Sequence, residues 1–301
     1  MLADAAARPA LSVVVVVYAG GAAVVRFLEA LRTQQGLSDP IEVIIAAAQD
    51  MVDASAVHAV TPGARLLRGP SGAHPAQLRA LGVAVASAPI VACTEDHCVP
   101  APDWCVRILA AHREPALAVG GAIQKLQPDS AIAWAAYLLE YARFMPPLES
   151  GPAHYVSDCN VSYKRGVLTE IAATWHSAFH ETSVHNALRQ RAGATAIVLD
   201  PTIVVLQSRH PEAGTFFAER FDHGRLFARL RAATYGTVGR LAYGAAALGL
   251  SPLIVLRALA HAWRQRDARV GALRALPYLV VAATCWSVGE SLGAITAARS
   301  R

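Results

Sequence analysis

The feature that most constrains this chain is a series of short apolar runs that alternate with helical patterns through its first half. Residues 11–19, LSVVVVVYA, contain five successive valines and almost no polar side chain. This composition is typical of a strand buried on both faces of a parallel sheet. Further strands are predicted at 41–48, 64–69, 89–94 and 116–124, with helices at 22–36, 76–88, 104–112 and 132–145. The alternation predicts an α/β fold with an open, mostly parallel central sheet flanked by helices.

A second block begins near residue 151 and carries fewer of these alternating elements. It is predicted to contain a helix over 179–193, which stops at a glycine, and a strand over 195–208 with Pro201 inside it. We expect one domain over residues 1–235 and a helical tail over 236–301. The apolar run near the N-terminus is interpreted as the first strand and not as a signal peptide, because Asp4 and Arg8 precede it and no cleavage site follows.

The tail differs from the rest of the chain in charge and hydropathy. Between Arg209 and Arg274 eleven arginines accompany four acids, a local balance of +7 within an overall charge of +5. Apolar segments at 241–263 and 276–295 are broken by Ser251 and Pro252 and by Glu290, so neither offers the about 20 uninterrupted apolar residues of a spanning helix. We expect helices that lie in a membrane interface, on the cytoplasmic face of the cell membrane, with a soluble helical cap as the alternative.

The cysteines do not indicate a metal or disulfide framework by their spacing. There are five, an odd number, and no pair has the CxxC spacing of a zinc site. A reducing cytoplasm is the simpler compartment for such a chain. The cysteines are Cys93, Cys98, Cys105, Cys159 and Cys285.

A polar cluster, TEDHC, follows the predicted strand at 89–94. Ligands of open α/β sheets bind beyond the carboxyl ends of the strands, so the cluster lies where a site is expected. Carboxylates suit Mg²⁺, and Mn²⁺ also accepts imidazole, which makes Glu95, Asp96 and His97 candidate metal ligands. Neighbouring side chains of a strand point to opposite faces, so Glu95 and His97 are expected on one face and Asp96 on the other. A polar strand-to-loop junction without a metal is the plain alternative.

The order of several short motifs resembles glycosyltransferase family 2, the inverting nucleotide-sugar transferases of the GT-A fold. No single motif is specific, but the set keeps the family's order over residues 10–230. In this sequence the matching residues are Val17 and Tyr18, Arg79 and Gly82, Thr94 to His97, Gly120 and Gly121, Asn160 to Arg165, and Glu181.

The resemblance implies roles for these residues. It implies a divalent cation, Mn²⁺ or Mg²⁺, held by Glu95, Asp96 and His97, and Glu181 as the general base that activates the acceptor hydroxyl. His97 replaces the family's last acid, so a metal-independent site, where protonated His97 meets phosphate, remains open. The residues expected to contact the nucleotide-sugar donor are Tyr18, Asp50, Arg79, Glu95, Asp96, Asn160 and His210.

Three positions depart from the family's pattern and leave alternatives open. Ala47 stands where an acid grips the nucleobase, with Asp50 a few positions later, and Thr182 stands where the family's usual base lies. We expect a membrane-associated inverting glycosyltransferase that uses a nucleotide-sugar donor and a lipid-linked or polysaccharide acceptor, and no nucleic acid. A non-catalytic scaffold subunit of a surface-glycan assembly is the rival; nucleotidyl transfer lacks the expected lysine-bearing phosphate loop.

Overall fold

The computed structural model describes residues 8–126 and 130–297 of the chain. They form two compact units, which are described separately. The first contains the described residues up to 124 together with Phe144–Ser208, and the second contains the described parts of Lys125–Arg143 and of the chain from Arg209 onward. The division therefore falls earlier than the expected boundary at residue 235, and one internal segment joins the second unit. The interpretation of the N-terminal apolar run as a strand and not as a signal peptide relies in part on Asp4, and residues 1–7 lie outside the described residues.

The first unit is built on a nine-stranded sheet with the order β3-β2-β1-β4-β8-β6-β9-β5, in which β7 also pairs with β9. The strands β1 to β4 correspond to the predicted runs at 11–19, 41–48, 64–69 and 89–94, and β9 runs through Pro201. The bounds are β1 Leu11–Val16, β2 Ile41–Ala48, β3 Arg65–Gly69, β4 Ile90–Glu95, β5 Cys98–Pro100, β6 Ala118–Lys125, β7 Gly151–Pro152, β8 Asn160–Lys164 and β9 Ile197–Gln207.

The sheet is mixed, and this refines the expectation of a mostly parallel one. The strands β3, β2, β1 and β4 are parallel neighbours, as the alternation with helices requires. Beyond β4 the pairs β4–β8, β8–β6, β9–β5 and β9–β7 are antiparallel. The second block lacks the regular helical crossovers that parallel pairing needs, which explains why its strands enter the sheet in the opposite direction.

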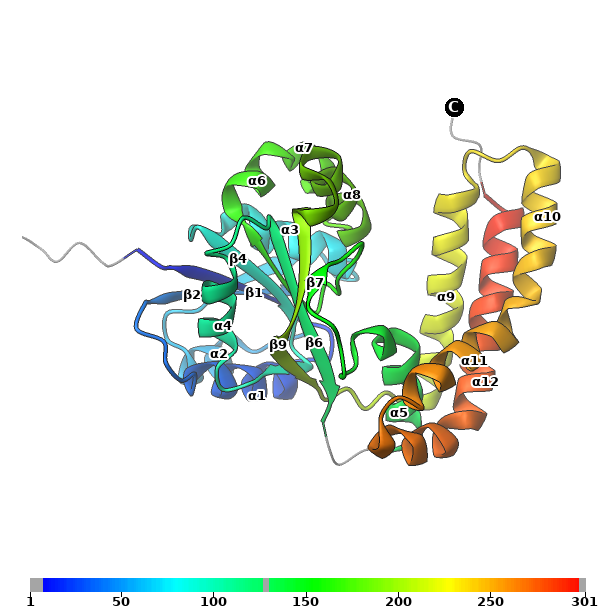
Figure 1. Cartoon of the computed structure of the whole chain (residues 1–301), viewed down its shortest axis with the longest axis horizontal. Coiled ribbons are helices and arrows are strands. Elements are labelled where there is room, and N and C mark those ends of the chain that lie inside the picture. Colours follow the sequence, from blue (N-terminus) through cyan, green and yellow to red (C-terminus); the bar gives the residue numbers. More distant parts are fainter. Residues whose placement is uncertain (1–7, 127–129, 298–301) are drawn as a thin grey trace, which may run out of the picture. The chain divides into compact units, whose positions relative to one another are not determined.

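Helices cover both faces of this sheet (Figure 1). On one face the buried side chains of α3, α6, α7 and α8 share a core with strand residues such as Val14 and Ile44. The start of α3 is fixed by a capping box between His74 and Gln77. Gly82 allows α3 to lie close to β1, because a Cβ there would come 2.4 Å from Val14 Cγ1. The bounds are α1 Gly21–Arg32, α2 Ala54–Val60, α3 Pro75–Val85, α4 Trp104–Ala111, α6 Arg165–Glu170, α7 Ala172–Trp175, α8 Glu181–Ala192, with 3-10 turns η1 Ala142–Phe144 and η2 Gly193–Ala196.

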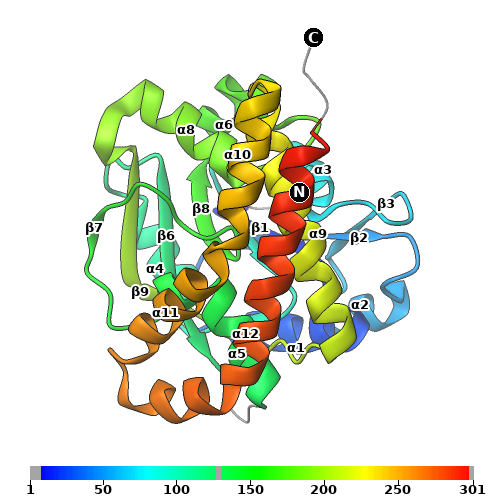
Figure 2. The same ribbon diagram turned by 90° about the vertical axis from the view of Figure 1, so that its right-hand side faces the viewer.

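The second unit is helical, and its helices pack through small residues. In Figure 2, α9, α10 and α12 lie side by side. Gly289 and Gly293 of α12 have the small-xxx-small spacing that lets helix backbones approach closely; a Cβ on them would come 2.1 Å from Phe221 O and 2.2 Å from Arg225 O of α9. The bounds are α5 Ala131–Glu140, α9 Ala213–Ala232, α10 Thr237–Leu248, α11 Leu250–Ala262 and α12 Arg266–Ile295.

The helix α12 contains the apolar segment expected at 276–295, in which Glu290 interrupts the apolar run. It runs unbroken over 30 residues, with Pro277 inside it, and by length and composition alone it is long enough to cross a membrane. Half of an apolar 18-residue stretch of this helix is buried within the protein. Glu290 does not interrupt the helix, because its carboxylate is buried and accepts hydrogen bonds from the Tyr243 hydroxyl and from Trp286 Nε1. The pair α10 and α11 is bent by 51° at Gly249, and Ser251 and Pro252, the expected breaking residues, lie in the first turn of α11.

Candidate functional site

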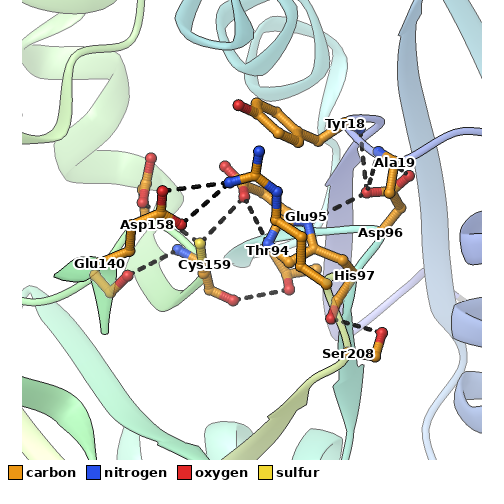
Figure 3. A network of polar contacts seen from close by, with 12 residues as sticks. Tyr18, Ala19, Thr94, Glu95, Asp96, His97, Glu140, Asp158, Cys159 and Ser208 are labelled. Atoms are coloured by element: carbon orange, nitrogen blue, oxygen red, sulfur yellow. Dashed lines mark hydrogen bonds and ion pairs between the residues drawn. The ribbon is translucent and has the colours of Figure 1, made fainter. Parts of the chain in front are cut away.

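The candidate site lies where β1, β4 and β8 meet at one edge of the sheet. Since β1 and β4 are parallel, Glu95 at the end of β4 lies beside Val16 at the end of β1. The strand β8 is antiparallel to β4 and pairs Asn160 with Thr94, so the residues just before β8 arrive at the same edge. Thr94 Oγ1 donates a hydrogen bond to the carbonyl of Cys159 at 2.8 Å (Figure 3). The expected position of TEDHC at a strand end is therefore what the structure shows.

Asp96 is turned to the other side of the strand end and holds a loop. Its carboxylate is buried and accepts hydrogen bonds of 2.9–3.1 Å from the backbone amides of Tyr18, Ala19 and Gly20, which lead into α1 (Figure 3). Three amide donors satisfy this carboxylate without a cation. Asp96 belongs to neither of the two described groups with metal-ligand geometry. Its predicted role as a metal ligand stays a prediction, and the geometry assigns it the shape of the β1–α1 loop.

Arg79 joins two carboxylates at this edge. It is buried on α3, and its Nη2 lies 3.1 Å from Glu95 Oε1 and 2.8 Å from Asp158 Oδ2. Burial would lower the pKa of Arg79, but Asp158 and Glu95 raise it, so the guanidinium stays charged. Burial, followed by repulsion from Asp158, raises the pKa of Glu95 in spite of His97 and Arg79. The predicted donor residue Arg79 is thus in place at the site, as the bridge between two acids.

His97, Cys98 and Cys159 form a second buried group beside Glu95. One imidazole nitrogen and the two thiol sulfurs lie within 4.8 Å of one another. His97 Nε2 is 3.4 Å from Glu95 Oε2, and the Cys159 thiol donates a hydrogen bond to that oxygen at 3.2 Å. Burial would lower the pKa of His97, but Cys98, Asp96 and Glu95 together raise it well above its ordinary value. Burial would likewise raise the pKa of Cys98, but Cys159 and His97 lower it.

Two groups among the described residues have the geometry to hold a metal ion, and they share Cys159. One contains Glu95, Asp158 and Cys159, and the other contains His97, Cys98 and Cys159. The first has the oxygen ligands that Mg²⁺ or Mn²⁺ prefers, but the Arg79 guanidinium already bridges its two carboxylates. A hard divalent cation would have to share these acids with a buried positive charge. The oxygen set therefore does not fit such an ion as it is built, although ligand groups for a divalent cation are present.

Glu181 lies at the first position of α8, next to this acidic edge. Its carboxylate accepts a hydrogen bond from the Tyr155 hydroxyl at 2.8 Å. Burial, followed by repulsion from Asp158, raises its pKa above 4.5, against the lowering effects of Tyr155 and Arg79. A carboxylate with a raised pKa is a better proton acceptor than an ordinary one. Thr182, the next residue, is exposed and has no carboxylate, so Glu181 is the acid available at this helix start.

The other predicted donor residues are only partly brought together. Tyr18 is half-buried at the site, and its ring meets the His97 ring edge-on at a centroid distance of 5.8 Å. Asn160 is buried, and its amide bonds the carbonyls of Ala122 and Ile203 and accepts from Trp104 Nε1, so it crosslinks the sheet instead of lying open to a ligand. Asp50 is exposed in the loop after β2. His210 belongs to the second unit, so nothing follows about its distance from the site.

The sequence reasoning missed Cys98 and Cys159 as parts of the site. They are separated by 60 intervening positions and have no ligand-like spacing, so only the antiparallel pairing of β8 with β4 brings them together. The sequence did contain one signal, because Asp158 and Cys159 directly precede the predicted family motif that begins at Asn160. The ion pair of Asp158 with Arg79 has no signal of its own in the sequence.

Comparisons with known proteins agree with this architecture. Among solved structures, a mannosyltransferase from Pyrobaculum calidifontis in complex with GDP-Man and Mn²⁺ is similar over 90% of this chain and 75% of its own, at 17% identity and a TM-score of 0.51. A mycobacterial protein is similar over 72% of this chain and 73% of its own, at 14% identity and a TM-score of 0.50. Identities this low show a common fold. Curated proteins give no significant match.

The mixed sheet with its acidic strand end places the chain in the class of proteins with a GT-A-like fold. The sequence profile described as glycosyl transferase family 2 matches residues 12–172, more than half of the chain. The chain belongs to this family, as the order of its motifs predicted. The matched span covers β1 to β8, and so contains Arg79, Glu95 to His97, and Cys159.

Proposed function

We propose that the protein transfers a sugar from a nucleotide donor to a lipid-linked or polysaccharide acceptor, with inversion at the anomeric carbon. The observation that carries the proposal is Glu181, which accepts a hydrogen bond from Tyr155 and whose pKa is raised by burial and by the charge of Asp158. In the proposed reaction the acceptor hydroxyl gives its proton to Glu181 Oε as its oxygen attacks the anomeric carbon. The nucleoside diphosphate leaves from the opposite side, which inverts the configuration.

The residues around Glu181 have positioning roles in this proposal. The Tyr155 hydroxyl holds one carboxylate oxygen of Glu181 and leaves the other for the acceptor. Asp96 holds the β1–α1 loop, and the ring of Tyr18 from that loop forms a wall of the proposed donor site. The divalent cation that the resemblance implies, Mn²⁺ or Mg²⁺, is given no role in this reaction. No step above depends on it, because Arg79 occupies the oxygen ligands.

We further propose that the second unit associates with the cytoplasmic face of the cell membrane. Exposed leucines, valines and aromatic residues lie on α9 to α12 together with exposed arginines such as Arg229, Arg257 and Arg274. Apolar side chains insert at the headgroup boundary, and arginines favour anionic headgroups. A lipid-linked acceptor would then be presented to the first unit at the membrane surface. This proposal includes two expectations from the sequence, that the helices lie in the membrane interface and that the membrane-associating tail spans residues 236–301.

The test is nucleotide binding followed by transfer. Titration calorimetry with a panel of nucleoside diphosphates, with and without Mn²⁺, should give binding to at least one of them. A screen of nucleotide sugars against washed membranes should then give a labelled glycan or lipid product. If no nucleotide binds under either condition, the enzyme proposal is wrong and the scaffold role is favoured. Binding without any transfer, in a protein that also binds the acceptor glycan, would leave the same scaffold role.

A further inference from the structure

The group around Cys159 has a composition that neither the family nor the proposed transfer explains. His97, Cys98 and Cys159 are each no more than 2% exposed, and Glu95 next to them is 8% exposed. Imidazole and thiolates are ligands that zinc-class ions prefer, whereas Mg²⁺ prefers oxygen. Two cysteines buried against a histidine and a carboxylate are therefore chemically different from an oxygen-lined phosphate site.

We propose that His97, Cys98 and Cys159, with Glu95 as the fourth ligand, form a site for a thiolate-binding divalent ion of the zinc class. The site shares the strand end with the proposed donor site but goes beyond the transfer reaction, since it requires no sugar nucleotide. It differs from the expectation drawn from the cysteine spacing, which suggests no zinc site.

Two observed distances match edges of the coordination tetrahedron of such an ion. With Zn–N and Zn–O bonds of about 2.0 Å and Zn–S bonds of about 2.3 Å, ideal N–O and S–O edges are about 3.3 Å and about 3.5 Å. The observed His97 Nε2–Glu95 Oε2 and Cys159 Sγ–Glu95 Oε2 distances are 3.4 Å and 3.2 Å. All members of the histidine–cysteine group lie within 4.8 Å of one another. The ligand atoms thus need shifts of only a few tenths of an ångström on these two edges.

Two neighbours have the positions of outer-shell partners. His97 Nδ1 lies 3.5 Å from Asp96 Oδ1, and Asp96 is itself fixed by the three loop amides. A carboxylate behind a ligating histidine is the common way to orient the ring and to set its tautomer. On β9, Gln207 is directly opposite Cys98 and so points to the same face of the sheet. The fully buried amide nitrogen and oxygen of Gln207 find no hydrogen-bond partner among the described residues. A metal–thiolate centre on the same face of the sheet would supply a polar partner for this amide.

The charges also balance. A divalent ion bound by the two cysteines and by a neutral His97 displaces the protons that these groups carry, and the two thiolates offset its charge. Arg79 continues to neutralise Asp158 and the other oxygen of Glu95. The guanidinium contacts Glu95 Oε1 and Asp158 Oδ2, whereas the proposed ion would be held through Glu95 Oε2 and the two sulfurs.

The experiment measures metal binding by the full chain without any donor. Protein purified without chelators should contain about one zinc per chain by elemental analysis. After removal of the metal under reducing conditions, titration with Co²⁺ should give thiolate-to-cobalt charge-transfer absorption, and equimolar Mn²⁺ should not displace the cobalt. Cys98→Ser and Cys159→Ser should each weaken binding by at least about 100-fold, more than the loss of an outer-shell partner. Cys285→Ser, a half-buried cysteine of the second unit, is the matched control and should bind as the unmodified chain does.

Several outcomes would overturn the inference. They are the absence of zinc and of any cobalt band in the unmodified chain, cobalt binding without a thiolate band, and unchanged binding by both cysteine variants. If a variant does not fold, as judged by circular dichroism, the spectrum of the unmodified chain still decides, because the charge-transfer band requires sulfur ligands. A chain that shows the band but binds no nucleotide would keep this inference and refute the proposed transfer. A chain that transfers sugar without the band would do the reverse.

Discussion

The two units of this protein bury and expose opposite kinds of side chain. In the described part of the first unit, the exposed large apolar residues are Met51 and Leu81, while Arg79, Glu95, Asp96 and His97 are buried. The second unit exposes large apolar residues along α9 to α12, among them Val238, Leu253 and Leu256. Burial of charge is costly unless partners are supplied, and exposure of many apolar groups is unusual for a soluble surface. The contrast supports both proposals, that the first unit carries the chemistry and that the second contacts an apolar environment.

The largest effect is expected where that chemistry is concentrated. Glu181→Gln should lower kcat by about 10²–10⁴-fold, because the amide cannot accept the acceptor's proton, while nucleotide binding stays unchanged. Because the pKa of Glu181 is raised above 4.5, kcat/KM should fall as the pH drops through that raised value, where the base becomes protonated. The acidic limb should therefore lie above pH 4.5 and should be absent from the residual activity of the variant.

The matched control is Glu212→Gln in the second unit, where the acid is exposed at the start of α9. It should leave turnover and the pH profile unchanged. Full activity of Glu181→Gln would remove Glu181 as the base, and an equal loss in both variants would contradict the division of labour between the units. Steady-state rates over a pH series measure both outcomes.

The second effect compares two buried arginines that each bridge two acids. Arg79 joins Glu95 and Asp158 in the first unit, and Arg209 joins Glu140 and Glu219 in the second. Removal of one partner from a buried ion pair leaves uncompensated charge and costs about 3–5 kcal/mol. We expect Arg79→Met and Arg209→Met to lose stability at the lower end of that range, because Asp158 and Glu219 are partly exposed.

Function should separate the two arginine variants. Arg79→Met should abolish nucleotide binding, and Arg209→Met should retain it at temperatures where the chain stays folded. Urea unfolding followed by circular dichroism gives the loss of stability, and calorimetry gives the binding. Arg65→Gln, which removes an ion pair that is 49% exposed on the arginine side, should cost at most about 1 kcal/mol. An Arg79 variant as stable as this control would show that the buried bridge contributes little.

The sequence predicted the first unit better than the site within it. The strands β1, β2, β3 and β4 could be located because a parallel sheet buried on both faces needs nearly continuous apolar runs, such as the valines of β1. The strand end at Glu95 could be located for the same reason. The proximity of Cys98 and Cys159 could not be predicted, because it depends on the antiparallel pairing of β8 with β4. Such pairing leaves no periodic signal in the sequence. The buried bridge of Arg79 was hidden for a similar reason, since an arginine on a helix is normally expected at the surface.

In the second unit the sequence indicated helices but not their continuity. Glu290 was expected to interrupt an apolar segment, because a lone carboxylate is costly to bury. The structure supplies Tyr243 and Trp286 as hydrogen-bond donors from α10 and from the same helix, and α12 continues. Such compensation comes from tertiary packing and cannot be derived from one segment alone. The role of the α12 glycines in close helix packing likewise becomes visible only once α9 is known to lie against them.

A third prediction tests packing by backbone contact in the second unit. Gly293→Ala should destabilise the chain by about 1–3 kcal/mol, because the new Cβ would come 2.2 Å from Arg225 O and must push α9 away from α12. Gly214→Ala in α9 meets no heavy atom within 4 Å and should be neutral or stabilising by up to about 1 kcal/mol, since alanine favours the helix. Thermal unfolding compares the two. Equal stability of both variants would show that α9 and α12 are not held by close backbone contact.

The smallest effect concerns the exposed apolar surface itself. Leu253 and Leu256 of α11 are 62% and 63% exposed, so they add little to folding but are available to a membrane. Each leucine side chain that inserts contributes about 1 kcal/mol or more, so the double change Leu253→Ser and Leu256→Ser should weaken binding to anionic vesicles by roughly tenfold or more. Met51→Ser, an exposed apolar residue of the first unit, should leave binding unchanged. Cosedimentation with vesicles measures all three proteins, and added salt should weaken the arginine contribution while leaving the leucine difference in place. If the unmodified chain fails to sediment with anionic vesicles at low salt, the membrane assignment of the second unit is wrong, and its exposed apolar residues need a protein partner instead.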